Sequence, residues 1–381
     1  MTSKHVKKDR VARQLETINF AVFSCEFTTE NGQAVVTRRV VNHVLPDVGE
    51  SVPCVFPSGG AAKSILAWLL ACFRLFWALC TSRVGAVYVV CSRTTPGFFR
   101  DLPGLLTVYL GKRVIVHCHG SDFESLLSSG PLSGLARRIY RNCEVIFPSH
   151  HLSERMKDRV KIAHLCENFF VAAEAAQSAA NQDPSSLQVV WNSNVMASKG
   201  FFDVVSAVEV LVRQGHQIDL LCFGKVQSDH EMLEVDVRSK MRQYEGCDWF
   251  SYLGMVPHAC AVGAIRDGDV VALPSRYTSE MQPLAVIEAM CSGKRVIVSD
   301  RASLRETVGD YPADIVPINN VPEIAKDIER LYHEKRSDPS KFKNKNIDAA
   351  IASNKRFSAE VFDLKMKDIL LRGKLDRSSE T

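Results

Sequence analysis

The sequence lacks several patterns that would assign a chain to a special class. Its 12 cysteines form no C-x-x-C pair, which argues against a zinc site and against a disulfide framework, and we expect reduced thiols. No internal repeat or long low-complexity stretch interrupts the chain. The first seventeen residues are polar and basic, without the apolar segment of a signal peptide, so we expect a cytoplasmic protein.

Long hydrophobic runs are also missing. The most apolar segment, residues 65–80, has 16 residues and contains Arg74, so it is too short and too interrupted to cross a bilayer. We expect a helix buried in the core of a domain. The alternative is a helix that lies in a membrane interface.

Two apparent ligand motifs fail on inspection. Residues 57–64, P-S-G-G-A-A-K-S, nearly match a nucleotide P-loop, but Ala62 stands where a glycine should precede Lys63 and the first glycine is wrongly spaced. The D-G-D sequence at residues 267–269 could be taken for a metal-binding D-x-D motif. Because it directly precedes an apolar strand, residues 270–273, we expect a turn and no catalytic metal.

The most informative stretch is residues 275–300. The apolar run directly before it, residues 270–273, predicts a strand that ends at Pro274. Residues 275–300 then predict a loop, a helix and a further strand of the same parallel sheet. Pro283 suits the start of the helix, because its missing N–H would be unpaired there, and Gly293 suits the position just after the helix end.

A pair of carboxylates flanks this helix start. Glu288 is the only charged residue between Met281 and Ser292, and a carboxylate on an apolar helix needs a partner. That partner could be a structural arginine, backbone amides or the hydroxyls of a ligand. Glu280 precedes the helix, whose unpaired N–H groups can hold a phosphate. The spacing fits a sugar hydroxyl at one carboxylate and a ribose at the other.

The pattern P-S-x4-E-x2-P-L-x2-I-E-A-M-x2-G-x2-V-I, residues 274–297, resembles the donor-site signature of the retaining GT-B glycosyltransferases of family 4. The resemblance implies an α/β fold with two doubly wound Rossmann-like domains that face each other across a cleft. It also implies a metal-independent hexosyltransferase that uses a nucleotide-diphosphate sugar as co-substrate, with no other cofactor. Where family members often carry Gly-Phe-Gly, this chain has Met281, Gln282 and Pro283.

Other candidate site residues follow expected strands. The loop after residues 18–23 contains Asn31 and Gly32, which alone would indicate only a turn. His119 and Asp122 follow residues 113–118, where open α/β sheets bind ligands, although Asp122 could simply cap the histidine in a turn. In the family the corresponding histidine lies close to the transferred sugar.

A further loop, residues 193–200, contains Lys199 and Gly200. The family has an arginine before this Lys-Gly pair, and the two cations bind the donor diphosphate. This chain has Ser193 and Asn194 at that place, so we expect Lys199 to supply most of the positive charge.

The resemblance, carried residue by residue, implies three groups of site residues. We expect catalytic roles for His119, Lys199 and Glu280, and acceptor binding by Asn31 and Asp122. We expect the donor to contact Gly32, Asn194, Lys199, Glu280, Met281, Gln282, Pro283, Leu284 and Glu288.

The domain organisation follows from the order of expected strands and helices. We expect an N-terminal acceptor domain over residues 1–170, a linker over 171–186 and a nucleotide-sugar domain over 187–355. Residues 356–381 are expected to form a helix that returns to the first domain, followed by a tail.

Charge differs between the two halves. Residues 1–170 contain 21 Lys and Arg against 13 Asp and Glu, net +8, whereas residues 171–381 contain 26 against 30, net −4. A basic first domain suits an anionic acceptor or an anionic membrane surface, including peripheral binding to the inner face of the membrane. A solvated surface without a partner is the alternative. No nucleic-acid-binding module is present.

The function that we expect is transfer of a sugar to an acceptor hydroxyl with retention, in cell-surface glycan or polysaccharide biosynthesis. The acceptor is expected to be a glycan or a lipid-linked precursor. A sugar-nucleotide epimerase of related fold and a catalytically inactive binding module are the alternatives.

Overall fold

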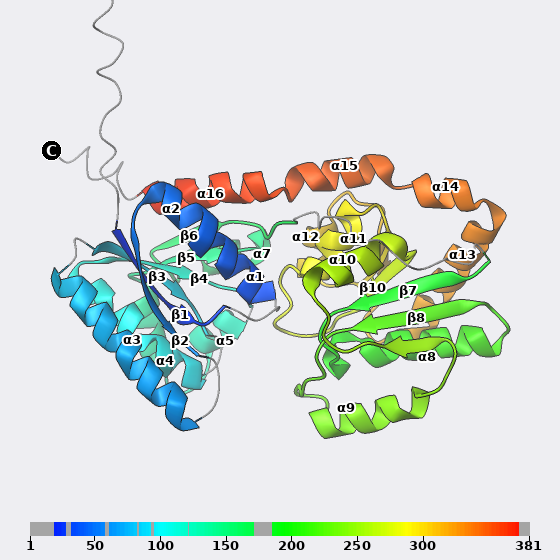
Figure 1. Cartoon of the computed structure of the whole chain (residues 1–381), viewed down its shortest axis with the longest axis horizontal. Coiled ribbons are helices and arrows are strands. Elements are labelled where there is room, and N and C mark those ends of the chain that lie inside the picture. Colours follow the sequence, from blue (N-terminus) through cyan, green and yellow to red (C-terminus); the bar gives the residue numbers. More distant parts are fainter. Residues whose placement is uncertain are drawn as a thin grey trace, which may run out of the picture.

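The computed structural model describes residues 19–27, 32–57, 61–81, 84–92, 95–120, 122–170 and 185–372. They form two α/β domains that lie side by side, each built on a six-stranded parallel sheet with helices on both faces (Figure 1). The expected fold class is thereby confirmed. Asn31, most of the expected linker and the tail after Arg372 lie outside the described residues.

The first sheet has the strand order β2-β1-β3-β4-β5-β6. Its members are apolar β-branched runs because both faces of the sheet are covered. The strands are β1 (Asn19–Cys25), β2 (Ser51–Phe56), β3 (Val84–Val90), β4 (Arg113–His117), β5 (Glu144–Phe147) and β6 (Ile162–Leu165).

Two helical layers cover this sheet. Along β1, Ala21 and Phe23 point to one apolar cluster, and Phe20 and Val22 to the other. The first cluster lies under α3 (Ala61–Thr81), α4 (Thr95–Leu106), α5 (Asp122–Ser128), α6 (Ser133–Tyr140) and α7 (His150–Met156). The second lies under α1 (Gly32–Arg39), the π-helix η1 (Val40–Val44), α2 (Leu45–Val48) and the C-terminal helix α16 (Ala359–Leu371).

Helix α3 is not the buried core helix that the sequence suggested. Among the side chains of α3 that the structure describes, only Ala71, Leu75 and Ala78 are buried, so 17% of the residues of Ser64–Thr81 are buried. The expectation that this segment is too short to cross a bilayer was also wrong, because α3 has 21 residues and Ser64–Thr81 is long and apolar enough to do so by length and composition alone. In the fold it connects β2 to β3, and both of these strands pair with β1 in parallel. The two ends of α3 therefore return to the same sheet.

The second sheet has the order β12-β11-β10-β7-β8-β9, the doubly wound order in which the sequence direction reverses between β10 and β7. Its strands are β7 (Leu187–Asn192), β8 (Ile218–Phe223), β9 (Phe250–Tyr252), β10 (Val270–Leu273), β11 (Arg295–Ser299) and β12 (Asp314–Val316).

Its helices lie on both faces of the sheet. They are α8 (Phe201–Arg213), α9 (Glu234–Met241), α10 (His258–Asp267), α11 (Leu284–Cys291), α12 (Ala302–Val308), α13 (Val321–Ser337), α14 (Pro339–Asn344) and α15 (Ile347–Arg356). Short 3-10 turns are η2 (Thr107–Leu110), η3 (Ala197–Lys199) and η4 (Arg242–Tyr244). Gly293, with φ of +70°, follows the C-cap of α11, as the sequence predicts.

The C-terminal helix α16 lies against the first domain (Figure 1). Arg39 of α1 makes two hydrogen bonds to the Asp363 carboxylate, at 3.0 and 2.6 Å. Arg113 of β4 donates to the carbonyls of Ile369 and Leu370, so it satisfies acceptors that the helix end leaves unpaired.

Side chains from loops and from helices α12 and α15 join the domains. Gln282 accepts from the Asn168 N–H at 2.5 Å and donates to Glu167 at 3.1 Å. Arg356 donates to the same Glu167 carboxylate at 2.5 Å. Glu306 of α12 accepts from the backbone N–H groups at the start of α7. The loop that carries Glu280 is therefore also part of the contact between the domains.

Candidate functional site

The candidate site lies at the switch point of the second sheet. The loop after β7 contains Lys199, and the loop after the adjacent strand β10 contains Glu280. Both loops leave the carboxyl ends of parallel strands on either side of the point where the strand order reverses, which is where open α/β sheets bind ligands. The sequence placed both residues on these loops.

Glu280 and Lys199 form a nearly buried ion pair. The Lys199 ammonium lies 3.0 Å from Oε2 of Glu280 and also donates to the Ser193 hydroxyl at 3.0 Å. The Ser275 hydroxyl donates to the same Oε2 at 3.3 Å. In the described part of the chain no donor binds Oε1 of Glu280, so this oxygen is left to accept from a ligand hydroxyl.

Arg301 is a second cation at this loop, and sequence reasoning missed it. Its guanidinium donates to the carbonyl of Arg276 at 2.6 Å and to that of Thr278 at 3.4 Å. Burial lowers the pKa of Arg301, while the Glu280 carboxylate acts in the opposite direction. Arg301 therefore holds the loop that positions Glu280. The polar residues directly after β11 were the sequence signal that could have identified Arg301.

Glu288, on α11, is 4% exposed, and its partners are side chains. His258 Nε2 lies 2.6 Å from Oε1, and the Asn192 amide donates to Oε2 at 3.0 Å. The partners are therefore neither an arginine nor backbone amides. Each carboxylate oxygen has two acceptor positions, so a ligand hydroxyl can still be bound beside these contacts. His258 is the first residue of α10, and sequence reasoning missed its role as a partner of Glu288.

The loop after β7 is pressed against its neighbours. Gly200 has φ of +83°, and a Cβ at this position would lie 2.5 Å from the Pro274 carbonyl oxygen. The Asp229 carboxylate accepts from the Ser198 N–H at 2.7 Å. Burial opposes ionisation of Asp229, but this bond and others to backbone N–H groups outweigh it and lower the pKa. The backbone before Lys199 is thus fixed, with only glycine tolerated after it.

Asn194 is the next residue of this loop that we expected at the donor. Its amide donates to Oε1 of Gln227 at 2.9 Å. This contact ties the loop after β7 to the loop after β8. A donor contact of Asn194 stays a prediction.

Leu284 of the second domain and Gly32 of the first lie close to each other at the start of α11. A Cβ on Gly32, the first residue of α1, would lie 3.3 Å from Leu284 Cδ1. Pro283 is the N-cap of α11, one residue earlier than expected. Met281 and Gln282 are buried, and Met281 packs in the apolar cluster of the first domain. A donor contact by either residue would therefore use its backbone.

Two histidine rings of the first domain lie close together at the end of β4, tilted by 34°. The ring centroids of His117 and His119 are 4.2 Å apart, as expected for residues on one face of a strand. His117 is fully buried, and Nδ1 lies 2.6 Å from the Tyr88 hydroxyl. Burial lowers its pKa to about 3, so His117 is neutral. His119 is half-buried, and Asp122 is the first residue of α5.

One group of possible metal ligands occurs among the described residues, and it lies elsewhere. His216, Glu329 and His333 have ligand atoms within 4.8 Å of one another. His216 follows α8, and the other two belong to α13, not to the loops of the candidate site. The Asp269 carboxylate of the D-G-D sequence accepts hydrogen bonds from the Lys335 ammonium at 2.7 Å and from the Gln188 N–H at 2.8 Å. Asp269 therefore has a structural role.

Comparison with known proteins finds a similarity between the second domain and a known protein family. Residues 175–349 match the family model described as Glycosyl transferases group 1. No curated protein matches the sequence.

Similar solved structures support the fold. Sucrose-phosphate synthase from Thermosynechococcus elongatus is 16% identical, with a TM-score of 0.69, over 95% of this chain and 98% of that chain. HepE from Anabaena, solved in complex with UDP-glucose, is 14% identical, with a TM-score of 0.69, over 92% and 99%. Trehalose 6-phosphate synthase from Burkholderia multivorans is 12% identical, with a TM-score of 0.67, over 95% and 98%. The two-domain GT-B arrangement thus extends over nearly the whole chain.

Proposed function

We propose that this chain is a glycosyltransferase that moves a hexosyl group from a nucleotide-diphosphate sugar to an acceptor hydroxyl, with retention and without a metal. The observation that carries the proposal is the Glu280–Lys199 pair at the switch point of a domain that matches the glycosyl transferases group 1 family. The structure of HepE with UDP-glucose supports a nucleotide sugar as donor.

The donor diphosphate is proposed to bind between Lys199 and the N-terminus of α11. A phosphate is stabilised there by unpaired N–H groups and by the positive end of the helix dipole. Lys199 already lies beside one anion, so the arriving phosphate shares its charge with Glu280. Arg301 supplies a second positive charge near Glu280. This charge offsets the negative charges of the Glu280 carboxylate and of the bound diphosphate.

The two carboxylates are proposed to bind different hydroxyl groups. Oε1 of Glu280 faces the transferred sugar, while Oε2 stays on Lys199 and Ser275. Glu288, held by His258 and Asn192, accepts from the ribose hydroxyls. From the first domain, His119 is proposed to lie near the sugar, and Asp122 and Asn31 near the acceptor.

In the proposed reaction the acceptor oxygen bonds to the anomeric carbon on the face from which the diphosphate oxygen leaves. The proton of the acceptor hydroxyl passes to that leaving phosphate, so no side chain has to act as nucleophile. The residues of this chain contribute by positioning the two substrates and by stabilising charge on the diphosphate. We place the reaction in the cytoplasm, on a glycan or lipid-linked acceptor for surface polysaccharide.

Turnover with product analysis tests this proposal. The protein is incubated with UDP-, GDP- and ADP-sugars and with sugar or lipid-linked acceptors, and release of nucleoside diphosphate is followed. We expect release that depends on the acceptor, with an anomeric proton coupling in the product that matches the donor. Conversion of the donor sugar without acceptor would support an epimerase instead. Donor binding without turnover on any acceptor would favour an inactive binding module.

A further inference from the structure

Helix α3 carries an exposed apolar surface, which we call the α3 stripe: Leu66, Leu69, Leu70, Phe73, Phe76 and Trp77. Each of these side chains is 51–63% exposed. Their spacing of three and four residues places them on one face of the helix, opposite the buried Ala71, Leu75 and Ala78. A surface helix of a soluble domain normally has polar residues on its outer face, so a continuous apolar face indicates a partner.

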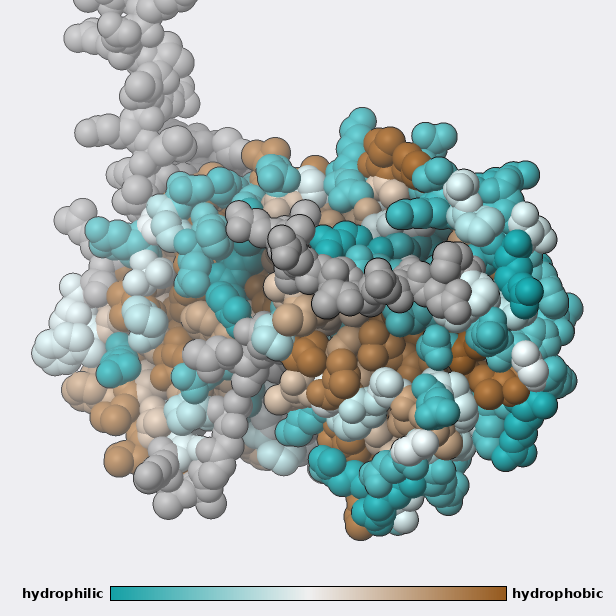
Figure 2. All heavy atoms as spheres, turned by 45° about the vertical axis from the view of Figure 1, so that its right-hand side comes forward, coloured by the Kyte–Doolittle hydropathy of each residue, from teal (hydrophilic) through white to brown (hydrophobic). Residues whose placement is uncertain are grey.

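The α3 stripe continues onto the neighbouring helices. The Trp68 indole of α3 donates to the Arg100 carbonyl of α4 at 2.8 Å. At the C-terminal end of α4 and in the following turn η2, the side chains of Leu106, Tyr109 and Leu110 are 43–67% exposed. Figure 2 shows hydrophobic side chains gathered at the lower left of the molecule, on the side where Figure 1 places α3. The apolar surface therefore covers more than one helix.

Next to this surface lies an arginine cluster, defined as Arg137, Arg138, Arg141 and Arg159. The Tyr109 hydroxyl donates to the Arg138 carbonyl at 3.2 Å, which joins the two surfaces. The buried residues of α3, α4 and α6 belong to one apolar cluster, so these helices cover the same face of the sheet.

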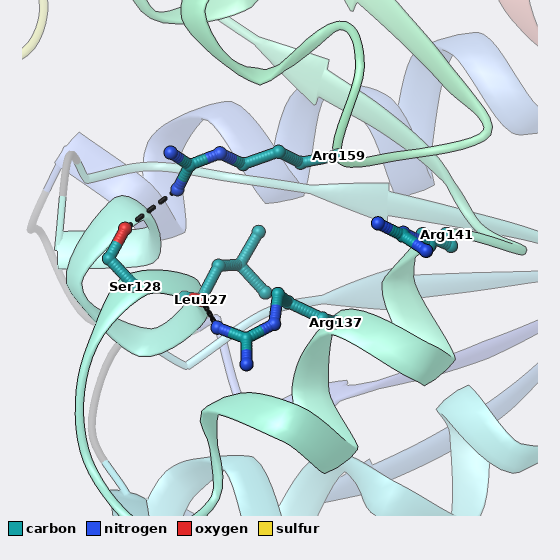
Figure 3. Close-up of a pocket in the computed structure, with 5 residues that line it drawn as sticks. All are labelled: Leu127, Ser128, Arg137, Arg141 and Arg159. Carbon is teal, nitrogen blue, oxygen red and sulfur yellow. Dashed lines mark hydrogen bonds between the residues drawn. The ribbon is translucent and has the colours of Figure 1, made fainter.

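Three members of the arginine cluster line a hollow whose described lining contains no carboxylate. Leu127, Ser128, Arg137, Arg141 and Arg159 line a cavity of about 310 Å³ (Figure 3). Arg137 donates to the Leu127 carbonyl at 2.8 Å, and Arg159 donates to the Ser128 hydroxyl at 2.7 Å. No ion pair joins these arginines to any carboxylate among the described residues. Their remaining N–H groups suit a phosphate.

We propose that the outer face of α3, α4 and α6 docks onto a bilayer that contains anionic phospholipids. The α3 stripe lies in the boundary between headgroups and acyl chains, and the arginine cluster binds lipid phosphates. A bilayer provides both an apolar layer and an anionic layer at one surface, which is the combination that this face presents. Because both ends of α3 return to the same sheet, the helix lies in the interface and does not span it.

The proposal goes beyond the sugar transfer and does not depend on it. Its test is cosedimentation of the full chain with vesicles of phosphatidylcholine alone, or of phosphatidylcholine with phosphatidylglycerol. We expect binding to the anionic vesicles at low salt, release as salt rises, and weak binding to the neutral vesicles. The tryptophan fluorescence emission should shift to the blue when the protein binds vesicles. Trp77→Phe should remove the part of this shift that Trp77 contributes.

Matched variants locate the surface. Phe73→Ser with Trp77→Ser should weaken vesicle binding by at least roughly tenfold. The control is Ile351→Ser with Leu364→Ser, two side chains that are 63% and 66% exposed on α15 and α16, and it should bind as the wild type does. Arg138→Gln with Arg141→Gln should lower affinity for anionic vesicles by roughly fivefold per residue and reduce its salt dependence.

Three results would overturn the proposal. The first is absence of binding to anionic vesicles at low salt. The second is equal loss of binding in the α3 pair and in the control pair. The third is self-association in sedimentation velocity that the α3 pair abolishes while vesicles are not bound, because the face would then belong to a second copy of the chain.

Discussion

At the scale of single residues, the two carboxylates of the candidate site differ in how many of their acceptor positions are used. Glu280 receives both of its contacts at Oε2, whereas Glu288 has a partner on each oxygen. Oε1 of Glu280 is therefore available to accept hydrogen bonds from a ligand. Glu288 is oriented by its neighbours. Each of its two oxygens would have to accept from a ligand while it also keeps the hydrogen bond to its neighbour.

This contrast predicts different losses for the two variants. Glu280→Ala should cut turnover while nucleotide binding stays mostly intact, because the lost oxygen faces the transferred sugar. Glu288→Gln should weaken nucleotide and nucleotide-sugar binding together. Turnover rates and calorimetric affinities measure both, with the exposed Glu245→Gln as control. Small and equal effects of the two variants on both quantities would contradict the assignment.

Sequence patterns could indicate which loops carry the site, but not how its charges are paired. Glu280, Glu288 and Lys199 occur in strongly patterned segments, so their elements could be predicted. His258 and Arg301 could not be assigned, because they reach the site from the starts of two other helices, α10 and α12, and their partners are set by tertiary packing. The same limit applies to Lys199, whose partner is a carboxylate 81 positions away in the sequence.

At the scale of elements, the contact between the loops after β7 and β10 depends on Gly200. Gly200→Ala should destabilise the fold and weaken diphosphate binding, since the new Cβ would lie 2.5 Å from the Pro274 carbonyl oxygen. Gly215→Ala is the control: φ there is also positive, at +91°, but no atom lies within 4 Å of the added Cβ. It should cost about 1 to 2 kcal/mol from backbone strain alone.

Urea unfolding measures the difference between these two glycine variants. Gly200→Ala should lose clearly more unfolding free energy than Gly215→Ala. If the two variants lose the same, the close contact at Pro274 relaxes without cost and does not fix the loop.

Strands β4 and β5 and helix α16 meet at Glu144, and this contact predicts a pH dependence. Burial opposes ionisation of Glu144, but hydrogen bonds from Arg113 and His164 outweigh it and lower its pKa from 4.5 to about 2. A carboxyl with a lower pKa in the folded state stabilises the fold above its unfolded pKa. That stability is lost as the pH falls from about 4.5 through about 2.

Acid titration of the unfolding free energy checks this expectation. The wild type should lose on the order of 3 kcal/mol through Glu144 across that range. Glu144→Gln should be less stable near neutral pH and should show a smaller decrease in acid. A variant with the same acid profile as the wild type would show that Glu144 does not carry the effect.

Elements with strong patterns were predictable, as in β10, whose expected and observed bounds are both 270–273. The edge strands β6 and β12 were not expected, because each is short and partly exposed, so neither forms a continuous apolar run. The orientation of α3 could not be read from its sequence either. An apolar helix is compatible with a core or with an interface, and only its packing on β2 and β1 distinguishes the two.

At the scale of the whole molecule, the donor loop and the contact between the domains share residues. Met281 and Gln282 directly follow Glu280 and bind the first domain, and Arg356 and Gln282 both bind Glu167. A ligand that moves the loop at Glu280 must therefore also act on this contact. This arrangement links donor binding in the second domain to the position of the first.

The central claim is that the switch point of the second domain binds a nucleotide diphosphate through Lys199, and calorimetry tests it most directly. UDP, GDP and ADP are titrated together with their nucleosides into the wild type, Lys199→Ala and the control Lys225→Ala, which changes an exposed lysine after β8. We predict that the wild type and the control bind at least one diphosphate alike. Lys199→Ala should lose about 1.5 to 3 kcal/mol of that affinity, the range of a hydrogen bond to a charged group, with nucleoside affinity almost unchanged. A wild type that binds no nucleoside diphosphate, or a Lys199→Ala variant that loses diphosphate and nucleoside affinity equally, would contradict the account.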